Sequence, residues 1–297
     1  MTVTETAEPH CVRAHAAKDF KSGAHPIWCP GCGDYGVLAA LERALARHGR
    51  EPHEVVLVSG IGCSSRLPAY TSCYGFHGVH GRALALATGL KLTRPDLEVI
   101  AVGGDGDGYS IGGNHFIHAC RRNVDMLYIV MDNRVYGMTK GQPSPTTEPD
   151  WDSEIAPGGI GLRPFNPLSI AIAAGANFVA RGFSSDTEDL AAMIVEGLRW
   201  PGFAFLEVLS PCITFRPEQV DWKRRARPRA ATIEGDRAAA IGAVLADDGF
   251  SMGVLFRGER AAIPAPQSPA GSLAEIERQF AIGAQARLEG REAGRQP

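Results

Sequence analysis

The feature that most limits how this chain can fold is an alternation of short apolar runs with stretches of helical periodicity. The apolar runs lie at 54–62, 97–107, 124–133, 177–183 and 202–212. The stretches with helical spacing lie at 33–49, 81–96, 114–123, 167–176 and 187–200. Short apolar runs are typical of strands buried on both faces. The alternation therefore predicts an α/β fold, a parallel sheet with helices on both faces.

The two ends of the sequence differ from this central part. Residues 1–25 are polar and are expected to form an N-terminal arm, and 26–225 contain the alternating pattern of the main domain. Residues 226–297 begin with a basic, proline-containing segment, and we expect a C-terminal tail with one weak strand at 252–256. Inside the main domain, 134–166 is rich in glycine and proline and lacks periodicity, and a loop of that length is usually functional.

Composition and charge exclude several classes of protein. With 297 residues, 44% of them hydrophobic and 21% charged, the sequence is typical of a globular protein. A formal net charge of −3 argues against nucleic-acid binding, which usually requires a basic face. No apolar run reaches the ~18 residues of a membrane span. Because the N-terminus also lacks the pattern of a signal peptide, we expect a cytoplasmic protein.

Two polar motifs follow neighbouring predicted strands. GGDGDG ends one strand and MDNRVYGMT ends the next, so that Asp105 and Asn133 are separated by one strand–helix–strand crossover. Glycines at a strand end let backbone N–H groups approach a phosphate, and carboxylate and amide oxygens suit Mg²⁺. In open α/β sheets, ligands bind at this edge. A GDG followed by Asn at this spacing is the signature of thiamine diphosphate binding.

Other interpretations of the glycine-rich motif explain less. A plain glycine-rich turn with Asp105 as a helix N-cap accounts for the first motif but not for Asn133. The order of the glycines differs from that of a dinucleotide-binding fingerprint. The lysine and hydroxyl residue that complete a P-loop do not follow it either.

The chain has seven cysteines, an odd number, and cytoplasmic proteins rarely contain structural disulfides. Cys29 and Cys32 form a C-x-x-C before the first predicted helix, while Cys63 and Cys212 each follow a strand. By count, four thiolates fit a [4Fe–4S] cluster and a structural zinc ion equally. We favour the cluster, because Cys63 shares its sheet edge with the glycine-rich loop, where a redox centre has a use. The others are interpreted as bystander thiols: Cys11, Cys73 and Cys120.

A third segment, RLPAYTSCYGFHGVHGRA at 66–83, contains candidate catalytic residues. Arg66 would bind a substrate carboxylate through paired hydrogen bonds, although a surface salt bridge is the commoner role of an arginine. His80 would bind a phosphate or stabilise charge at a reacting carbon. A structural histidine at a helix start explains His80 nearly as well.

Together these motifs resemble the β subunits of 2-oxoacid:ferredoxin oxidoreductases, and within that family those acting on 2-oxoglutarate. The resemblance covers roughly 20–225 and is weak after 230. It rests on WCPGCGDYG, GIGCSSR, FHGVHGRA, GGDGDGYSIGGNHFIHACRRN and DNRVYGMTKGQPSPTT. The resemblance implies an α/β thiamine-diphosphate-binding fold.

The resemblance also implies roles for individual residues. Mg²⁺ would be held by the side chains of Asp105 and Asn133 and the carbonyl of Val135. The diphosphate would be lined by Gly104, Gly106, Asp107, Tyr136, Gly137, Met138 and Thr139, and the rest of the cofactor by Ile61, Gly62, Cys63, Ser64 and His80. One [4Fe–4S] cluster would be bound by Cys29, Cys32, Cys63 and Cys212. Arg66 would face the substrate carboxylate, and Arg66 and His80 would take part in catalysis.

A reaction and partners are implied as well. The family oxidatively and reversibly decarboxylates a 2-oxoacid with coenzyme A, here most like 2-oxoglutarate to succinyl-CoA and CO₂, and exchanges electrons with ferredoxin. An α subunit would supply the pyrimidine-binding domain and an activating Glu. This chain alone is then expected to be inactive and to work as part of an (αβ)₂ assembly.

Three alternatives to this function stay open. Pyruvate or branched-chain 2-oxoacids would be substrates of the same chemistry. An Fe–S electron-transfer subunit without thiamine chemistry would not need Asp105 and Asn133. A thiamine enzyme without a redox step would not need the four cysteines, and it would carry its pyrimidine domain in the same, longer chain.

Overall fold

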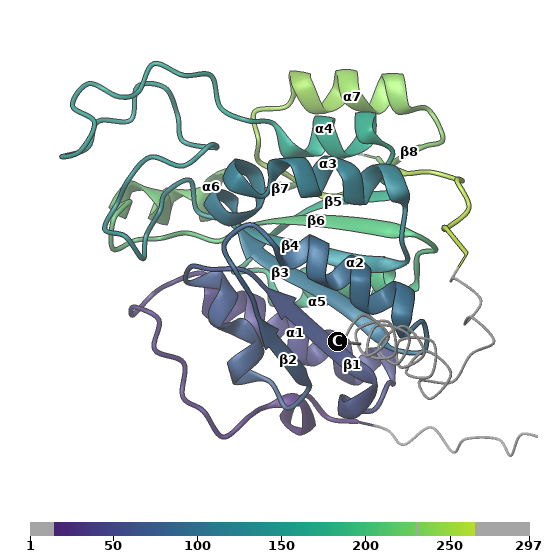
Figure 1. Cartoon of the computed structure of the whole chain (residues 1–297). Coiled ribbons are helices and arrows are strands. Elements are labelled where there is room, and N and C mark those ends of the chain that lie inside the picture. Colours follow the sequence, from purple (N-terminus) through teal and green to yellow (C-terminus); the bar gives the residue numbers. More distant parts are fainter. Residues whose placement is uncertain (1–14, 230, 265–297) are drawn as a thin grey trace, which may run out of the picture. The chain divides into compact units, whose positions relative to one another are not determined.

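The computed structural model describes residues 15–229 and 231–264, which are built around one mixed sheet (Figure 1). Its strands are β1 (Val55–Ser59), β2 (Tyr74–His77), β3 (Glu98–Gly104), β4 (Met126–Asp132), β5 (Phe178–Phe183), β6 (Phe203–Leu209), β7 (Arg227–Pro228), β8 (Ile233–Glu234) and β9 (Ser251–Arg257). They follow the order β2–β1–β3–β4–β6–β5–β9–β7, and β8 also pairs with β9. All pairs are parallel except β5 with β9.

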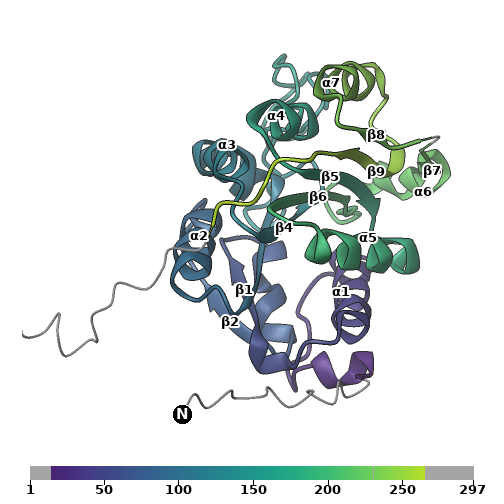
Figure 2. The ribbon, with the colours of Figure 1, turned by 90° about the vertical axis from the view of Figure 1, so that its right-hand side faces the viewer.

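Helices cover both faces of this sheet. They are α1 (Asp34–His48), α2 (Ala83–Thr93), α3 (Gly113–Arg122), α4 (Pro167–Ala174), α5 (Thr187–Arg199), α6 (Trp222–Arg225) and α7 (Arg237–Ala246). Figure 2 shows α1 and α5 on one face and α2, α3, α4 and α7 on the other. This arrangement confirms the predicted α/β fold with helices on both faces.

The sheet is buried on both faces, which explains why the strands are apolar without alternation. On β3, Ile100 and Val102 pack into the core under α1 and α5, whereas Val99 and Ala101 pack into the opposite core. Successive side chains of a strand point to opposite faces, so each face requires its own set of apolar residues. At roughly 25 cal/mol per Å² of buried apolar surface, these two cores are the main stabilising term of the fold.

The predicted strands and helices of the central part are all present, but the predicted strands are longer than the observed ones. The run at 54–62 ends as a strand at Ser59, and the run at 202–212 ends at Leu209. The polar and glycine residues that follow form the loops at the carboxyl edge. The sequence analysis also missed β2, a short edge strand whose four residues are all exposed.

The structure corrects the domain boundary that was expected between residues 225 and 226. Residues up to 264 belong to the same compact unit as the main domain. The expected weak strand at 252–256 is β9, which pairs with β5 and buries Leu255 and Phe256, and α7 packs against α4. The sequence signal was weak because α7 is rich in alanine and glycine, so its apolar face stands out little.

The N-terminal arm is only partly described. Residues 1–14 lie outside the described part, as do 265–297 of the expected tail. Ala17–Phe20 forms one turn of 3-10 helix, and Phe20 is completely buried against the core. The backbone N–H of Ser22 donates to the carbonyl of Tyr70 over 3.1 Å, which joins this segment to the domain.

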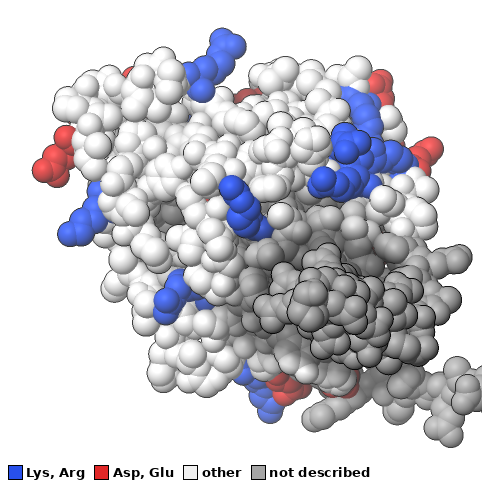
Figure 3. All heavy atoms as spheres, viewed as in Figure 1, with Lys and Arg blue, Asp and Glu red and all other residues white. Residues whose placement is uncertain are grey.

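Charged side chains are dispersed on the face of the molecule that Figure 3 presents. Most of the described surface in that view is uncharged, with single Lys or Arg side chains and one small group of them. Such a distribution produces a weak field over this face. Among the described helices, none has both the length and the apolar composition that crossing a bilayer requires.

Candidate active site

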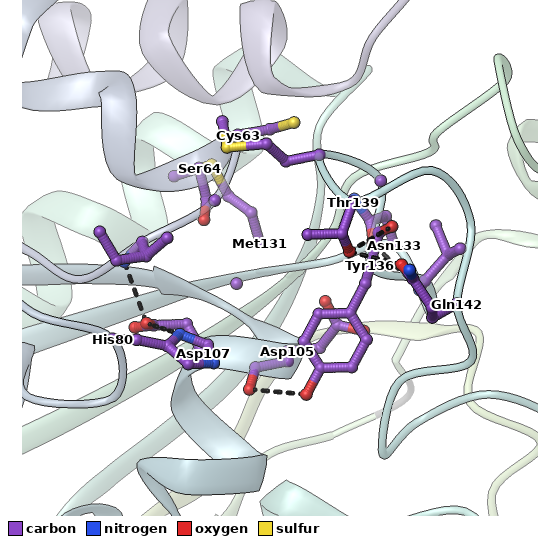
Figure 4. A pocket seen from close by; sticks show the side chains of 17 residues that line it. Cys63, Ser64, His80, Asp105, Asp107, Met131, Asn133, Tyr136, Thr139 and Gln142 are labelled. Atoms are coloured by element: carbon purple, nitrogen blue, oxygen red, sulfur yellow. Dashed lines mark hydrogen bonds and ion pairs between the residues drawn. The ribbon is translucent and has the colours of Figure 1, made fainter.

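The loops that follow the parallel strands enclose a cavity of about 550 Å³ (Figure 4). Residues 61–64 follow β1, 104–107 begin at the last residue of β3, and 133–139 follow β4. Because β1, β3 and β4 are neighbours in the sheet and run in the same direction, their carboxyl ends bring these loops together. The topology thus creates one site from segments more than 70 residues apart in the sequence.

All residues expected to contact a cofactor line this cavity. They are Ile61, Gly62, Cys63, Ser64, His80, Gly104, Asp105, Gly106, Asp107, Asn133, Val135, Tyr136, Gly137, Met138 and Thr139. Two further lining residues, Met131 and Gln142, were not predicted. Met131 is the penultimate residue of β4, and its apolar side chain carries no signal that separates it from the core. Gln142 lies in the non-periodic loop.

Asp105 places a buried carboxylate in the cavity wall. Its residue is 3% exposed, and its Oδ2 accepts hydrogen bonds from the hydroxyls of Ser144 and of Thr146, the latter over 3.0 Å. Burial raises the pKa of the Asp105 carboxyl, and these two hydrogen bonds oppose that rise. The hydroxyl donors come from the loop after β4, which explains why a loop without periodicity belongs to the site.

A second buried carboxylate, Asp132, lies beside the first. Thr146 Oγ1 is 3.0 Å from Asp105 Oδ2 and 2.7 Å from Asp132 Oδ1. Burial raises the pKa of Asp132, and the neighbouring Asp105 raises it further. Two carboxylates that share one hydroxyl repel each other, and a cation in the cavity would relieve this repulsion. The donor set at this point therefore fits Mg²⁺, which prefers oxygen ligands.

Asn133 is the second predicted oxygen donor. It lines the same cavity as Asp105 and lies to one side of it in Figure 4. Its Oδ1 accepts a hydrogen bond from the backbone N–H of Val135 over 3.1 Å. Its carbonyl accepts from the Gln219 side chain over 2.7 Å. Gln219 is completely buried and was not predicted, since nothing in its sequence context separates it from a surface glutamine.

Gly106 lines the cavity and packs closely against Tyr136. A Cβ atom at this position would lie 2.2 Å from the Tyr136 ring, whose hydroxyl donates to the Gly106 carbonyl over 3.2 Å. Any side chain here would push Tyr136 out of place. The close packing of the two motifs explains why the second glycine of GDG has no room for a side chain.

Asp107 and His80 form a contacting pair on the other side of the cavity. The Oδ1 atom of Asp107 lies 2.8 Å from His80 Nδ1. The same oxygen accepts from the backbone N–H groups of Ile61, over 3.0 Å, and Gly81, over 2.7 Å. Asp107 lines the cavity as expected, and all three of these contacts are made by its Oδ1 atom.

The four cysteines predicted to act together lie near one another, and none of them forms a disulfide. The backbone N–H of Gly33 donates to the carbonyl of Pro211 over 3.0 Å, which joins the C-x-x-C segment to the one carrying Cys212. The Trp28 indole donates to the Cys63 carbonyl over 2.8 Å. Cys29 is exposed, whereas the other three are partly buried.

The cysteines lie close enough for the charge of one thiolate to raise the pKa of another. Burial, together with the charges of Asp34, Cys212 and Cys29, raises the pKa of Cys63 to about 11. Burial also raises the pKa of Cys32 and of Cys212. Within the described residues, no three His, Cys, Asp or Glu side chains surround a single metal ion. In a [4Fe–4S] cluster each cysteine binds a different iron atom, so the sulfurs need not converge on one point.

In the cluster-free chain, iodoacetamide is expected to alkylate Cys29 at least about tenfold faster than Cys73 or Cys120. Cys73 and Cys120 are both buried, and burial raises the pKa of Cys73 to about 12 and that of Cys120 as well. Mass spectrometry of peptides after a short reaction at pH 8 measures the rates, with urea-unfolded chain as the control that labels every cysteine. Equal rates in the folded chain would contradict this assignment.

Known proteins match most of the described chain. Residues 33–208 match the family model of the C-terminal, thiamine pyrophosphate-binding domain of thiamine pyrophosphate enzymes. The chain is 47% identical over 208 residues to the 2-oxoglutarate oxidoreductase subunit KorB of Mycobacterium tuberculosis, an alignment covering 70% of this chain and 56% of that protein. It is 47% identical over 190 residues to a 2-oxoacid:ferredoxin oxidoreductase subunit beta of a Sulfolobus species, covering 63% and 62%.

A solved structure is similar over a larger part. The 2-oxoglutarate:ferredoxin oxidoreductase from Magnetococcus marinus, with 2-oxoglutarate, coenzyme A and succinyl-CoA bound, matches with a TM-score of 0.83 and 38% identity, covering 92% of this chain and 93% of that one. This chain belongs to the 2-oxoacid:ferredoxin oxidoreductase β-subunit family. The resemblance seen in the motifs is thereby confirmed. The aligned region spans 56% and 62% of the two curated relatives, less than two thirds of each.

Of the two predicted catalytic residues of this β-subunit family member, His80 lines the cavity and Arg66 does not. Arg66 lies exposed on the 3-10 helix Ser64–Tyr70, directly after the cavity residues Cys63 and Ser64. Its backbone N–H donates to the Cys63 carbonyl over 3.2 Å. In the part of the chain that the structure describes, its side chain makes no ion pair. The guanidinium is therefore available to a group outside this chain's own cavity.

Proposed function

We propose that this chain is the β subunit of an enzyme that oxidatively decarboxylates a 2-oxoacid, using thiamine diphosphate, Mg²⁺ and one [4Fe–4S] cluster. The observation that carries the proposal is the position of Cys63. This residue lines the cavity that contains Asp105 and Asn133, and it also lies near Cys212 and Cys29. A family member with this arrangement has a cofactor cavity and a redox centre that share a wall.

The oxygen donors would hold Mg²⁺ and, through it, the diphosphate. Asp105 and Asn133 would bind the metal by their side chains, and Val135 by its carbonyl. The glycines at 104 and 106 and the Tyr136–Thr139 segment would surround the phosphates. These assignments are supported by their common position around the cavity and by the repulsion between Asp105 and Asp132.

The chemistry of the reaction belongs to the bound groups, and this chain orients them. When bound, thiamine diphosphate supplies a nucleophilic carbon and an electron sink for the loss of CO₂. Ile61, Cys63 and Met131 would form an apolar part of the wall beside the reacting atoms. Cys29, Cys32, Cys63 and Cys212 would hold the cluster, whose assembly displaces the protons that the raised thiol pKa values retain.

The proposed partners follow from the family. An α subunit would supply the pyrimidine-binding domain and an activating Glu, in an (αβ)₂ assembly, and ferredoxin would exchange electrons with the cluster. Coenzyme A would accept the acyl group. The cytoplasm is the proposed compartment, because the six free thiols of the described residues suit a reducing environment.

The proposed substrate is 2-oxoglutarate, with succinyl-CoA and CO₂ as products. Support comes from the 2-oxoglutarate enzymes among the similar proteins, one of which has 2-oxoglutarate and succinyl-CoA bound. Pyruvate and branched-chain 2-oxoacids are the competing substrates of the same chemistry. An Fe–S electron-transfer subunit without thiamine chemistry is disfavoured by the intact cavity.

The test is an anaerobic assay of the full chain co-purified with the α subunit of the same organism. A panel of 2-oxoacids with coenzyme A is combined with a viologen dye as electron acceptor. We expect dye reduction that requires both subunits, thiamine diphosphate and coenzyme A, with 2-oxoglutarate as the preferred substrate. A complex that binds the cofactor but reduces no dye with any oxoacid would refute the proposed function.

Replacing Arg66 with alanine is expected to raise KM for 2-oxoglutarate about 10- to 100-fold, the loss of a charge-assisted hydrogen bond. KM for coenzyme A should change by less than about twofold, since the carboxylate contact is specific to the oxoacid. Arg94→Ala, another exposed arginine, serves as the matched control and should leave both constants unchanged. Equal increases in the two KM values would contradict a role at the oxoacid carboxylate.

A further inference from the structure

The Asp107 carboxylate contacts the His80 imidazole, and the surrounding backbone holds this carboxylate in place. The Asp107 side chain is 2% exposed, and its Oδ1 atom has three partners: His80 Nδ1, Ile61 N–H and Gly81 N–H. The two backbone donors come from the loops after β1 and before α2. These two hydrogen bonds fix the carboxylate in one orientation. The third partner of Oδ1 is the imidazole of His80, a side chain.

The backbone on the far side of the carboxylate prevents it from turning away. A Cβ atom at Gly60 would lie 2.0 Å from Asp107 Oδ2, so the carboxylate packs directly against the end of β1. This Oδ2 atom is buried and has no hydrogen-bond partner within the described residues. An unpartnered buried carboxylate oxygen is costly. The fold thus holds Oδ1 against His80 and leaves Oδ2 without a hydrogen-bond partner among the described residues.

This contact determines which nitrogen of His80 faces the cavity. A carboxylate that accepts from Nδ1 keeps a proton on Nδ1 and leaves Nε2 pointing the other way. His80 lines the cavity, and its side chain is 40% exposed although its Nδ1 end is covered by Asp107. The Nε2 end therefore provides the polar atom that His80 presents to a bound molecule.

His80 lies away from the oxygen donors proposed for Mg²⁺. Figure 4 shows His80 and Asp107 at one side of the cavity, Asn133, Tyr136, Thr139 and Gln142 at the other, and Asp105 between them. A diphosphate held at Asp105 and Asn133 would occupy the second side. Ile61 N–H is bonded to the same carboxylate as His80, so His80 lies beside the wall that leads to Cys63.

We propose that Asp107 is a positioning residue, which holds His80 so that the unprotonated Nε2 accepts a hydrogen bond from the hydroxyl that the keto oxygen of the oxoacid becomes once the reacting carbon is attacked. This inference rests on the proposed function, and it changes the expected role of Asp107 from contacting the diphosphate to orienting a neighbouring side chain. When the reacting carbon is oxidised to the acyl group, that hydroxyl becomes a carbonyl. Its proton passes to Nε2, the two electrons leave one at a time through the proposed cluster to ferredoxin, and a base that is already oriented beside the hydroxyl speeds this transfer.

The orientation of His80 is tested first, and without turnover. In the full chain labelled with ¹⁵N-histidine, long-range ¹H–¹⁵N NMR reports which ring nitrogen carries the proton, and His80→Gln identifies the His80 signals. We expect the neutral ring to be protonated on Nδ1 in the wild type and on Nε2 in Asp107→Ala. A wild-type proton on Nε2, or the same tautomer in both proteins, would overturn the assignment of Asp107.

The catalytic role is tested by a double-mutant cycle in the complex with the α subunit. Asp107→Asn, which keeps the size of the side chain, and His80→Gln should each lower kcat on the order of 10²-fold. The double variant should be no slower than His80→Gln, because Asp107 acts through His80. His77→Gln is the matched control: its Nδ1 lies 2.8 Å from the Ser65 carbonyl, it does not line the cavity, and its kcat should be unchanged.

Binding measurements separate this role from its rivals. Calorimetric titration of the same variants with thiamine diphosphate should give dissociation constants within about threefold of the wild type. Binding weakened more than about tenfold at unchanged kcat would assign Asp107 to the diphosphate, and multiplicative losses in the double variant would assign it an independent role. Either result overturns the proposal. An inactive wild-type complex would count against the proposed function, and the tautomer of His80 would still decide the assignment of Asp107.

Discussion

Asp105→Ala is expected to abolish the binding of thiamine diphosphate in the presence of Mg²⁺, and with it at least about 10³-fold of the activity. The carboxylate is the one charged group among the proposed metal donors, and its removal leaves an amide and a carbonyl, which bind Mg²⁺ weakly. Calorimetry with and without EDTA measures the loss. A dissociation constant within about tenfold of the wild type would contradict the site.

A second substitution at this position, Asp105→Asn, should not weaken the ligand-free protein. Burial and the nearby Asp132 both make ionised Asp105 unfavourable, so its removal relieves repulsion instead of breaking a salt bridge. We expect the Tm of the ligand-free Asp105→Asn chain to equal or exceed that of the wild type. The rise in Tm that the cofactor and Mg²⁺ produce in the wild type should disappear. A Tm lower by many degrees would instead indicate that Asp105 is structural.

The second large effect is expected for Cys212→Ser, which should remove the iron–sulfur cluster or change its type. A serine hydroxyl is a poor substitute for a thiolate ligand of iron. We expect loss of iron, loss of the paramagnetic resonance signal of the reduced cluster, and at least about 10²-fold slower dye reduction. Cofactor binding should persist, since Cys212 does not line the cavity.

Cys120→Ala provides the matched control for this experiment. Cys120 is a residue of α3 and is completely buried, in the core on the opposite face of the sheet from α1. The variant should lose some stability, about 1 kcal/mol, and keep its iron and its spectrum. An unchanged signal in Cys212→Ser, or a lost one in Cys120→Ala, would show that the cysteines had been sorted wrongly.

The sequence could predict those parts of the site that sit in strong local patterns. Asp105 and Asn133 each end a run of apolar residues, so the strand pattern alone put both at one edge of the sheet. The glycines of GGDGDG were recognisable for the same reason. Once the strand order is known, the meeting of these residues at one cavity follows from the parallel sheet.

Other parts of the site had no such pattern. Ser144 and Thr146 lie in a loop without periodicity, and only the tertiary structure shows that their hydroxyls meet the Asp105 carboxylate. Gln219 connects the backbone of Cys212 with that of Asn133 through one buried side chain, a contact across more than 80 residues. Likewise β9 was underestimated, because its pairing with β5 is a property of the sheet and not of its own residues.

The double role of Cys63 has a consequence for the speed of electron transfer. Under the proposed function, one loop of a single polypeptide, residues 61–64, both borders the reacting carbon and holds one iron atom of the cluster. Docking of ferredoxin would not alter this part of the electron path. Substitutions at the ferredoxin contact should therefore change how fast the enzyme exchanges electrons with its external carrier, while oxidation inside the cavity keeps its rate.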